Sequence, residues 1–291
     1  MAESRALRSE REFHFTTKDF DRVRKLIYAH AGISLSDSKQ ELVYSRLSRR
    51  LRNTGIATFS AYLALLESND PVEWEAFTNS LTTNLTSFFR EPHHFPLLAE
   101  HLRSIRGKHP ISLWCSAAST GEEPYTMAMT VIDALGQDAS RVKIIATDVD
   151  TGVLETAKKG VYPEERVSKL SPDLIKRYFM RGTGEQAGSV RVRPELTDMI
   201  TFRQANLLHN NWSLRSPLDV IFCRNVMIYF DKQTQLDILK KFRPLLRSNG
   251  LLFAGHSESF HHADEYFKLR GKTIYELTPR FQAQHKVEES R

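Results

Sequence analysis

The segment ISLWCSAASTGEEP, residues 111–124, indicates the fold class of this chain. It begins as an apolar strand, continues through small residues, and ends on Glu122 and Glu123 before Pro124 opens a helix. A strand, a small-residue turn and a helix form the first unit of a doubly wound α/β domain. We therefore expect an α/β domain with parallel strands and crossover helices.

The turn within this segment suits a bound ligand. Small residues let a ligand approach the backbone, and the helix N-terminus points free N–H groups toward it. Glu122 and Glu123 would repel a pyrophosphate, but they suit a cation or a ligand with hydroxyl and ammonium donors. The alternative is an ordinary turn whose acids only favour the helix dipole. Asp148 follows the next apolar strand, where such folds hold a nucleotide ribose, and this favours the ligand.

Length and composition narrow the class of protein. The 291 residues are enough for one large domain and a smaller one. No apolar run approaches the length of a membrane span, and the charged N-terminus lacks the apolar region of a secretory signal. Cys115 and Cys223 lie near the ends of apolar strands, so we expect buried thiols in a reducing cytoplasm. No metal is expected, because no metal-ligand spacing is present. The net charge of +6 favours an acidic partner, either nucleic acid, lipid or protein.

Hydrophobic periodicity divides the chain into segments. It predicts a disordered leader, a small domain of short helices, a linker, an α/β domain with an insertion, and a polar tail. The predicted bounds are 1–12 for the leader, 13–81 for the helical domain, 82–92 for the linker, 93–281 for the α/β domain, about 176–202 for its insertion, and 282–291 for the tail. Alternating residues and glycines in the insertion predict a hairpin, and a further antiparallel strand pair ends the α/β domain.

The second predicted helix, residues 37–53, carries a run of basic residues in its part from residue 42 onward. Arg46, Arg49 and Arg50 share one helix face, and no acid occurs from residue 42 to residue 53. A solvated surface is the ordinary explanation of a charge run. The absence of interspersed acids favours contact with an acidic partner instead.

The linker, TTNLTSFFREP at residues 82–92, mixes hydroxyl groups, an amide, two aromatic rings and Arg90. A loop folded over a ligand pocket would explain this chemistry, since site residues often lie on loops. A packed connector between domains, anchored by Phe88 and Phe89, explains the composition equally well.

The chain resembles the chemotaxis receptor glutamate methyltransferases, the CheR family, in five ordered segments: TTNLTSFFRE, SAASTGEEPYT, ATDVD, CRNVMIYF and LLFAGHSES. The resemblance covers nearly the whole chain. It implies an all-α N-terminal domain, followed by a Rossmann-like S-adenosylmethionine-dependent methyltransferase domain with a small inserted antiparallel β-subdomain. It also implies S-adenosyl-L-methionine as cofactor, S-adenosyl-L-homocysteine as product, and a cytoplasmic enzyme that methylates glutamates on the cytoplasmic helices of methyl-accepting chemoreceptors.

The resemblance implies a cofactor-binding role for residues of the linker, the strand ends and the turns after them. These are Asn84, Thr86 and Arg90 over the cofactor, Glu123 at its amino-acid end, Asp148 at the ribose hydroxyls, Asn206 and Leu207 beside the adenine, and Arg224, Asn225 and Tyr229 near the methyl group. Glu122 is a neighbour of Glu123, and the choice between these two acids stays open.

The expected chemistry requires no general base, because a glutamate side chain with a pKa of about 4.3 is already ionised at pH 7. The enzyme must orient the carboxylate behind the methyl group and exclude water. Arg90 suits the first task, because a guanidinium grips a carboxylate bidentately. Tyr229 would border the methyl group, and its alternative role is that of a core aromatic.

Two surfaces are expected to contact the receptor. Arg46, Arg49 and Arg50 would face acidic receptor helices. In the insertion, a strand around residues 190–193 with an exposed edge can pair an extended peptide. Arg191 and Arg193 would lie on one face of that strand, where they could hold a terminal carboxylate or an acidic side chain. Some family members tether themselves to the receptor C-terminus through this subdomain, and the resemblance implies a tether loop at Gly182, Thr183 and Gly184. The alternative is that the insertion only covers the sheet. Neither nucleic-acid binding nor membrane insertion is expected.

Three other functions fit less well. Nucleic-acid methyltransferases acting on exocyclic amines show an Asn/Asp-Pro-Pro-aromatic turn where this chain has residues 224–227, Arg-Asn-Val-Met. A dehydrogenase is disfavoured because the turn before Glu123 lacks G-x-G-x-x-G. A module that only holds the cofactor is disfavoured because Arg90 and Tyr229 are both present.

Overall fold

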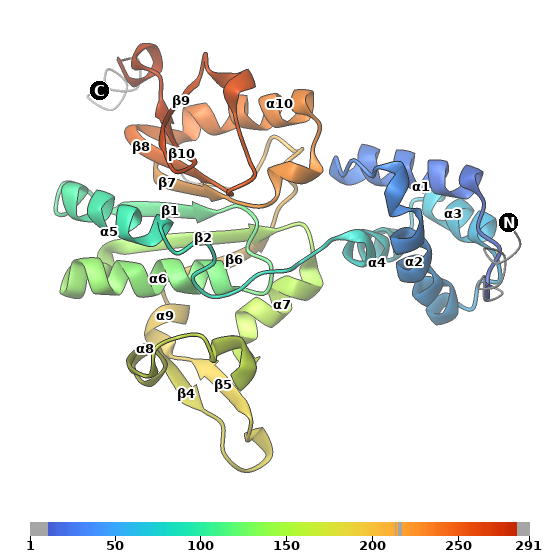
Figure 1. The fold of residues 1–291 in the computed structure, drawn as a ribbon, viewed down its shortest axis with the longest axis horizontal. Helices are drawn as coiled ribbons and strands as arrows, with labels where there is room; N and C mark the ends of the chain where they lie inside the picture. Colours follow the sequence, from blue (N-terminus) through green and yellow to red (C-terminus); the bar gives the residue numbers. More distant parts are fainter. Residues whose placement is uncertain (1–10, 213, 215–216, 284–291) are drawn as a thin grey trace, which may run out of the picture. The chain divides into compact units, whose positions relative to one another are not determined.

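The computed structural model describes residues 11–212, 214 and 217–283 (Figure 1). The chain forms two compact units, Met1–Thr83 and Asn84–Arg291. Their boundary falls inside the predicted linker. The predicted leader and tail lie outside the described residues except at residues 11–12 and 282–283.

The first unit is all-α, as predicted. Its helices are α1 (Thr17–Ala31), η1 (Asp37–Lys39), α2 (Gln40–Thr54), α3 (Phe59–Glu67) and α4 (Pro71–Leu81). Local sequence marks the helix ends. Thr16 and Asp19 form a capping box at the start of α1, and Gly32 ends the helix in the left-handed conformation that glycine adopts without strain. The apolar faces of these helices meet in one core, which includes Phe20, Leu47 and Phe77.

The second unit is built on a seven-stranded sheet with the order β6-β2-β1-β7-β8-β10-β9. The strands are β1 (Ile111–Cys115), β2 (Val142–Asp148), β6 (Ile200–Gln204), β7 (Leu218–Cys223), β8 (Leu246–Ala254), β9 (Phe267–Gly271) and β10 (Ile274–Leu277). The first five strands of this order pair in parallel, and β10 pairs antiparallel with β8 and β9. The predicted architecture of five parallel strands and a terminal antiparallel pair is therefore confirmed.

Helices cover both faces of this sheet. They are α5 (His94–Ile105), α6 (Glu122–Leu135), α7 (Thr151–Lys159) and α10 (Lys232–Phe242). Successive residues of β1 point to opposite faces, so Leu113 packs in a core with residues of α5 and α6, whereas Trp114 packs in a second core with residues of α10. Among the described residues, none of the helices has the length and apolarity that a bilayer crossing requires.

Short 3-10 helices join several of these elements. They are η2 (Gly136–Arg141), η3 (Glu164–Val167), η4 (Gly184–Gln186), η5 (Met227–Tyr229), η6 (Arg243–Leu245) and η7 (His261–Ala263).

A small antiparallel sheet, which we call the β-subdomain, interrupts the α/β alternation (Figure 1). It comprises β3 (Val161–Pro163), α8 (Pro172–Tyr178), β4 (Phe179–Arg181), β5 (Ser189–Val192) and α9 (Pro194–Thr197). Its first strand precedes the predicted insertion, 176–202. A three-residue strand is shorter than the runs from which periodicity identifies strands, so the sequence pattern missed β3.

The strand order β3-β5-β4 corrects the prediction of an exposed edge around residues 190–193. Both sides of β5 are paired, since Arg191 lies opposite Val161 on β3 and Met180 on β4. Arg193 lies beyond the strand end, at the N-cap of α9, and its guanidinium donates to the carbonyl oxygen of Lys176 at 3.3 Å. Arg191 and Arg193 therefore do not share one strand face.

Candidate active site

The two acids at the start of α6 have different partners. Glu122 is fully buried, pairs with Arg166 of η3, and accepts a hydrogen bond of 2.6 Å from the hydroxyl of Thr120. Glu123 pairs with Arg224 at 2.8 Å and accepts from the thiol of Cys115 at 3.3 Å. Burial raises the pKa of Glu123, against the opposing effect of the Arg224 charge. Only Glu123 is bonded to another predicted site residue.

The turn before these acids is closely packed, and Gly121 makes this possible. Its φ of 100° is strained for other residues, and a Cβ there would lie 2.9 Å from the Cβ of Ala157. The turn therefore packs directly against α7, to which Ala157 belongs.

Asp148 ends β2 and is only 8% exposed. Its carboxylate accepts the backbone N–H of Ser119 at 2.8 Å and that of Asp150 at 3.0 Å. Burial raises the pKa of Asp148 to about 6. A carboxylate has about four lone-pair sites, so these two bonds leave capacity for a ligand's hydroxyl groups.

Asp150 joins this site although the sequence did not single it out. It caps α7 through the N–H of Val153 at 3.2 Å, and it accepts the Nδ2–H of Asn84 at 2.7 Å. Its signal in the sequence is an acid at an N-cap position before an apolar helix. Ser119 in turn donates its hydroxyl to the carbonyl oxygen of Asn84 at 3.0 Å, so the linker is tied to the strand ends at both points.

The rest of the linker has features of both alternatives that the sequence left open, a packed connector and a loop over a ligand pocket. Phe88 is buried and packs edge-on against Tyr162 at 5.2 Å, as a packed connector would. Thr86 and Arg90 are half-buried, and Arg90 donates to the carbonyl oxygen of Leu85 at 2.9 Å. Both neighbours of Arg90 are non-glycine residues with left-handed φ angles, which are sparsely populated and cluster at functional sites.

Arg224, at the end of β7, is the centre of the site. It is 4% exposed, pairs with Glu123 at 2.8 Å and with Glu91 at 3.2 Å, and donates to the carbonyl oxygen of Arg90 at 2.5 Å. The end of β7 is therefore joined to the linker and to α6. Glu91 belongs to the quoted linker motif, but its role could not be predicted from the sequence.

Asn225 is held by two acids that the sequence also left without a role. Its side chain donates to Glu91 at 3.2 Å, and its N–H donates to Glu258 at 2.9 Å. Burial alone would raise the pKa of Glu91, but the N–H of His256 and the charge of Arg224 lower it overall. Burial raises the pKa of Glu258.

The remaining predicted site residues lie at the ends of β6 and β7. Asn206 accepts the N–H of Leu208 at 2.9 Å through its side chain, and Leu207 is buried in the core beside Trp212. Tyr229 is half-buried in η5, next to Ile228, which is 52% exposed. Tyr229 is therefore not a fully buried core aromatic.

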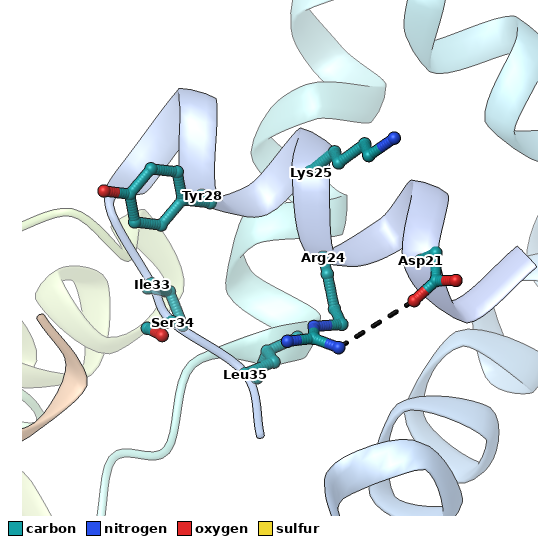
Figure 2. A pocket seen from close by; sticks show the side chains of 7 residues that line it. All are labelled: Asp21, Arg24, Lys25, Tyr28, Ile33, Ser34 and Leu35. Atoms are coloured by element: carbon teal, nitrogen blue, oxygen red, sulfur yellow. Dashed lines mark ion pairs between the residues drawn. The ribbon is translucent and has the colours of Figure 1, made fainter. Parts of the chain in front are cut away.

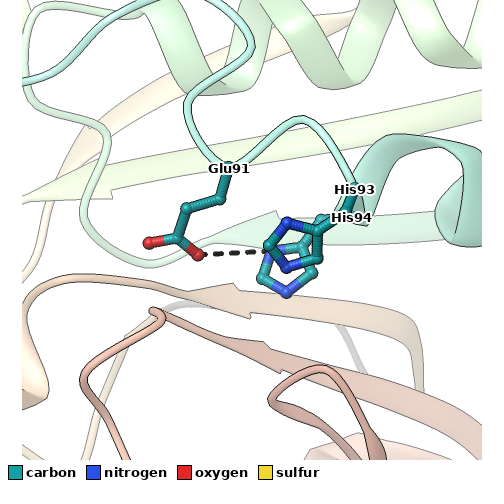
Figure 3. Close-up of side chains that lie close together, drawn as sticks. All are labelled: Glu91, His93 and His94. Carbon is teal, nitrogen blue, oxygen red and sulfur yellow. Dashed lines mark ion pairs between the residues drawn. The ribbon is translucent and has the colours of Figure 1, made fainter.

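Two histidines lie beside Glu91 (Figure 3). His94, the first residue of α5, is fully buried, and its Nε2 lies 2.8 Å from the carbonyl oxygen of Lys272. Its Nδ1 lies 3.7 Å from Oε2 of Glu91. Burial lowers the pKa of His94 to about 4, so the ring is neutral at pH 7.

In the helical unit, two of the three predicted surface arginines have internal partners. Arg46 donates to the carbonyl oxygens of Leu81 and Thr82 at 2.8 and 2.7 Å, at the end of α4. Arg50 makes a bidentate pair with the buried Glu73, at 3.1 and 2.7 Å. Arg49 is exposed. The sequence pattern showed the shared face but not these contacts.

A pocket of about 380 Å³ in the helical unit contains none of the predicted site residues (Figure 2). Its lining residues are Asp21, Arg24, Lys25, Tyr28, Ile33, Ser34 and Leu35. Arg24 is paired with Asp37 at 2.6 Å and lies 3.8 Å from Asp21. Acids of the same unit therefore already balance the charge of Arg24.

The β-subdomain carries a groove of about 270 Å³ across its three strands. The lining residues are Val161, Met180, Arg181, Gly182, Thr183, Gln186, Ser189 and Arg191. Gly182 is required by packing, because a Cβ there would lie 1.9 Å from the carbonyl oxygen of Gln186. Three predicted tether residues, Gly182, Thr183 and Arg191, therefore line one groove, whereas Gly184 and Arg193 do not.

Comparison with known proteins matches both units to one family. Residues 18–82 match the family described as "CheR methyltransferase, all-alpha domain", and residues 84–275 match "CheR methyltransferase, SAM binding domain". The chain is 55% identical over 260 residues to the "Chemotaxis protein methyltransferase" of Escherichia coli (strain K12), covering 89% of this chain and 90% of that protein. It is 53% identical over 265 residues to "Chemotaxis protein methyltransferase 2" of Pseudomonas aeruginosa, covering 91% and 94% of the two chains.

Proposed function

The chain belongs to the CheR methyltransferase family and is an S-adenosylmethionine-dependent chemotaxis protein methyltransferase, and from this we propose that it methylates glutamate side chains on the cytoplasmic helices of chemoreceptors. The observation that carries the proposal is the joining of Glu123, Arg224 and the linker at one end of the parallel sheet. Ligands of open α/β sheets bind outside the carboxyl ends of the strands.

The residues at this edge fit the cofactor. Its amino-acid end carries one ammonium and one carboxylate, and the Glu123–Arg224 pair offers one charge of each sign. Asp148 keeps accepting capacity for the ribose hydroxyls after its two backbone bonds. We assign Asn84, Thr86 and Arg90 to the cover of the pocket, Asn206 and Leu207 to the adenine side, and Asn225 and Tyr229 to the region of the methyl group.

When bound, S-adenosylmethionine supplies an electrophilic methyl group for an in-line displacement that forms a carbon–oxygen bond and breaks a carbon–sulfur bond. The substrate glutamate is already ionised at pH 7, so no residue of the chain has to remove a proton. Orientation of the carboxylate and exclusion of water are the tasks left to the protein.

Arg90 is our candidate for orienting the substrate carboxylate. One of its five N–H donors is used on the carbonyl oxygen of Leu85. Its backbone carbonyl accepts a hydrogen bond from Arg224, and this bond fixes Arg90 relative to the Glu123–Arg224 pair. The left-handed residues Phe89 and Glu91 on either side restrict this part of the linker further.

We propose that the enzyme works in the cytoplasm and contacts the receptor through two surfaces. Arg49 is exposed and suits an acidic receptor helix, whereas the contacts of Arg46 and Arg50 within the helical unit make them supports of this surface. In the β-subdomain, the groove next to Gly182 carries Arg181 and Arg191, which suit the terminal carboxylate or an acidic side chain of a receptor C-terminal peptide.

One assay tests the proposal. The enzyme and methyl-labelled S-adenosylmethionine are incubated separately with receptor-bearing membranes, with RNA and with DNA. Label that appears on the receptor and is released by base supports a glutamate methyl ester. Label on RNA or DNA would instead support the alternative of a nucleic-acid methyltransferase.

A further inference from the structure

Two buried acceptor atoms face each other next to the active site. Nδ1 of His94 and Oε2 of Glu91 lie 3.7 Å apart, and neither atom makes a hydrogen bond within the described part of the chain. Oε1 of the same carboxylate is fully used, since it accepts from the side chain of Asn225 and the N–H of His256.

The protonation of His94 follows from its other ring nitrogen. Nε2 lies 2.8 Å from the carbonyl oxygen of Lys272, and a carbonyl can only accept, so Nε2 carries the proton. In the neutral ring Nδ1 is then an acceptor. Oε2 has the charge of Arg224 3.2 Å away, whereas Nδ1 has no hydrogen-bond partner among the described residues. Burying an acceptor without a partner is costly, and a cation shared by Nδ1 and Oε2 removes this cost.

The ring of His94 is held in the way that metal-binding histidines are held. A histidine that binds a metal almost always donates its other N–H to a carboxylate or a backbone carbonyl, as His94 does to Lys272. The separation of 3.7 Å is close to the roughly 3.3 Å between two ligands of a tetrahedral zinc ion with bonds of about 2.0–2.1 Å.

His93 completes a set of three ligands. One ligand atom each from Glu91, His93 and His94 all lie within 4.8 Å of one another, and Figure 3 shows both rings beside the carboxylate. His93 is half-buried and so gives the set a side open to water. Two imidazoles and one carboxylate are a donor set that zinc and its neighbours in the first transition row accept.

Arg224 does not rule out a cation here. Its Nη2 lies 3.2 Å from Oε2 of Glu91, but the contact lacks hydrogen-bond geometry. The guanidinium also pairs with Glu123 and donates to the carbonyl oxygen of Arg90. A cation bound at Oε2 leaves both of these contacts in place, together with the two hydrogen bonds to Oε1.

We propose that Glu91, His93 and His94 form a binding site for one divalent transition-metal ion of the zinc class. The ion would fix the side chain of His94, at the start of α5, and that of Glu91. His94 contacts the turn between β9 and β10 at Lys272, and Glu91 contacts Asn225, so both contacts would be stabilised as well. This site goes beyond the methyl-transfer chemistry, which requires no metal.

The test uses the full chain without an affinity tag, freed of metal by a chelator. Zn²⁺ is titrated in competition with a chromogenic zinc chelator, and Co²⁺ is added separately so that its visible absorption reports the ligand geometry. The expected result is one tight site per chain with a tetrahedral Co²⁺ spectrum. His94→Gln retains a donor for the carbonyl of Lys272 and removes Nδ1, and it should weaken Zn²⁺ binding by at least about tenfold.

Surface histidines also bind zinc, so the controls decide the outcome. The matched control is the other His-His pair, changed as His261→Ala with His262→Ala, and it should bind Zn²⁺ as tightly as the parent. His93→Ala, at a half-buried position, replaces His94→Gln if that variant does not fold. The proposal is overturned if the parent shows no tight site, or if the control pair loses as much affinity as the site variants.

Discussion

At the scale of single residues, Asp148 has one task that the structure shows and a second that we propose. Its carboxylate holds the backbone of Ser119 and Asp150, and we propose that its remaining lone pairs accept the ribose hydroxyls. The hydrogen bonds show the backbone contacts directly, whereas ribose binding is tested by replacing the carboxylate.

Asp148→Asn should weaken cofactor binding by about 1.5–3 kcal/mol, the range for hydrogen bonds to a charged group. Because burial raises the pKa of Asp148 to about 6, the parent's carboxylate gains its charge as the pH rises through about 6, and cofactor affinity should rise with it. The variant should not show this rise. Calorimetry at several pH values is the measurement, and equal affinity and equal pH dependence in both proteins would remove Asp148 from the ribose site.

Arg90→Ala should lower turnover far more than cofactor affinity, because its proposed partner is the substrate carboxylate. Arg90→Lys is the matched control, since it keeps the charge but loses the bidentate grip, and we expect it to recover only part of the rate. Methylation rates on receptor membranes and cofactor affinity are measured together. Near-normal turnover of Arg90→Ala would make the residue purely structural.

At the scale of elements, α2 shows how far a charge pattern can be interpreted. The sequence correctly predicted a basic helix, but a pattern on one helix cannot show what its neighbours offer. Arg46 donates to a backbone carbonyl at the end of α4. Glu73 pairs with Arg50 and also accepts a hydrogen bond of 2.6 Å from the hydroxyl of Tyr62. Only the folded unit shows that these two arginines stabilise it.

The two neighbouring arginines should therefore behave differently when their charge is reversed. Arg49→Glu should slow receptor methylation and reduce its salt dependence, because an exposed charge steers association through a screened field. Arg50→Glu should instead lower the free energy of unfolding, because it leaves the buried Glu73 opposite a second acid. Methylation rates at low and high salt, with thermal unfolding of both variants, check this. Equal rates for Arg49→Glu and the parent at low salt would exclude the contact.

Other elements show which features the sequence could not supply. The central strands and the turn at Gly121 followed from local patterns. Glu91, Glu258 and Asp150 could not be given roles, because their partners come from distant parts of the chain. The central place of β5 was also missed, since it depends on pairing with the three-residue strand β3.

The β-subdomain groove gives a prediction about peptide binding. A receptor C-terminal peptide should bind with micromolar-range affinity, about −8 kcal/mol. Arg181→Glu with Arg191→Glu should abolish this binding without changing cofactor affinity, because both side chains line the groove and are exposed. Arg177→Glu, on α8 and outside this groove, is the control. Titration calorimetry with peptides from the host's receptors is the measurement, and no binding by any of them would mean that the enzyme works without a tether.

At the scale of the whole molecule, each unit has a separate part in the account. We propose that the helical unit offers the exposed Arg49 to the receptor, and that the α/β unit, which matches the SAM-binding domain, carries the linker residue Arg90 that orients the substrate. Binding through the β-subdomain would raise the local concentration of enzyme among clustered receptors without changing the chemistry. The two units match two domains of one family, at residues 18–82 and 84–275.

The most direct test of the central claim is transfer of a labelled methyl group from S-adenosylmethionine to receptor-bearing membranes, followed by treatment with base. We expect label on the receptor that base releases as methanol, because a glutamate methyl ester hydrolyses under these conditions. Replacing the acceptor glutamates by alanine should remove the label. Base-stable label on the receptor, or label transferred to nucleic acid instead, would contradict glutamate methylation of the receptor.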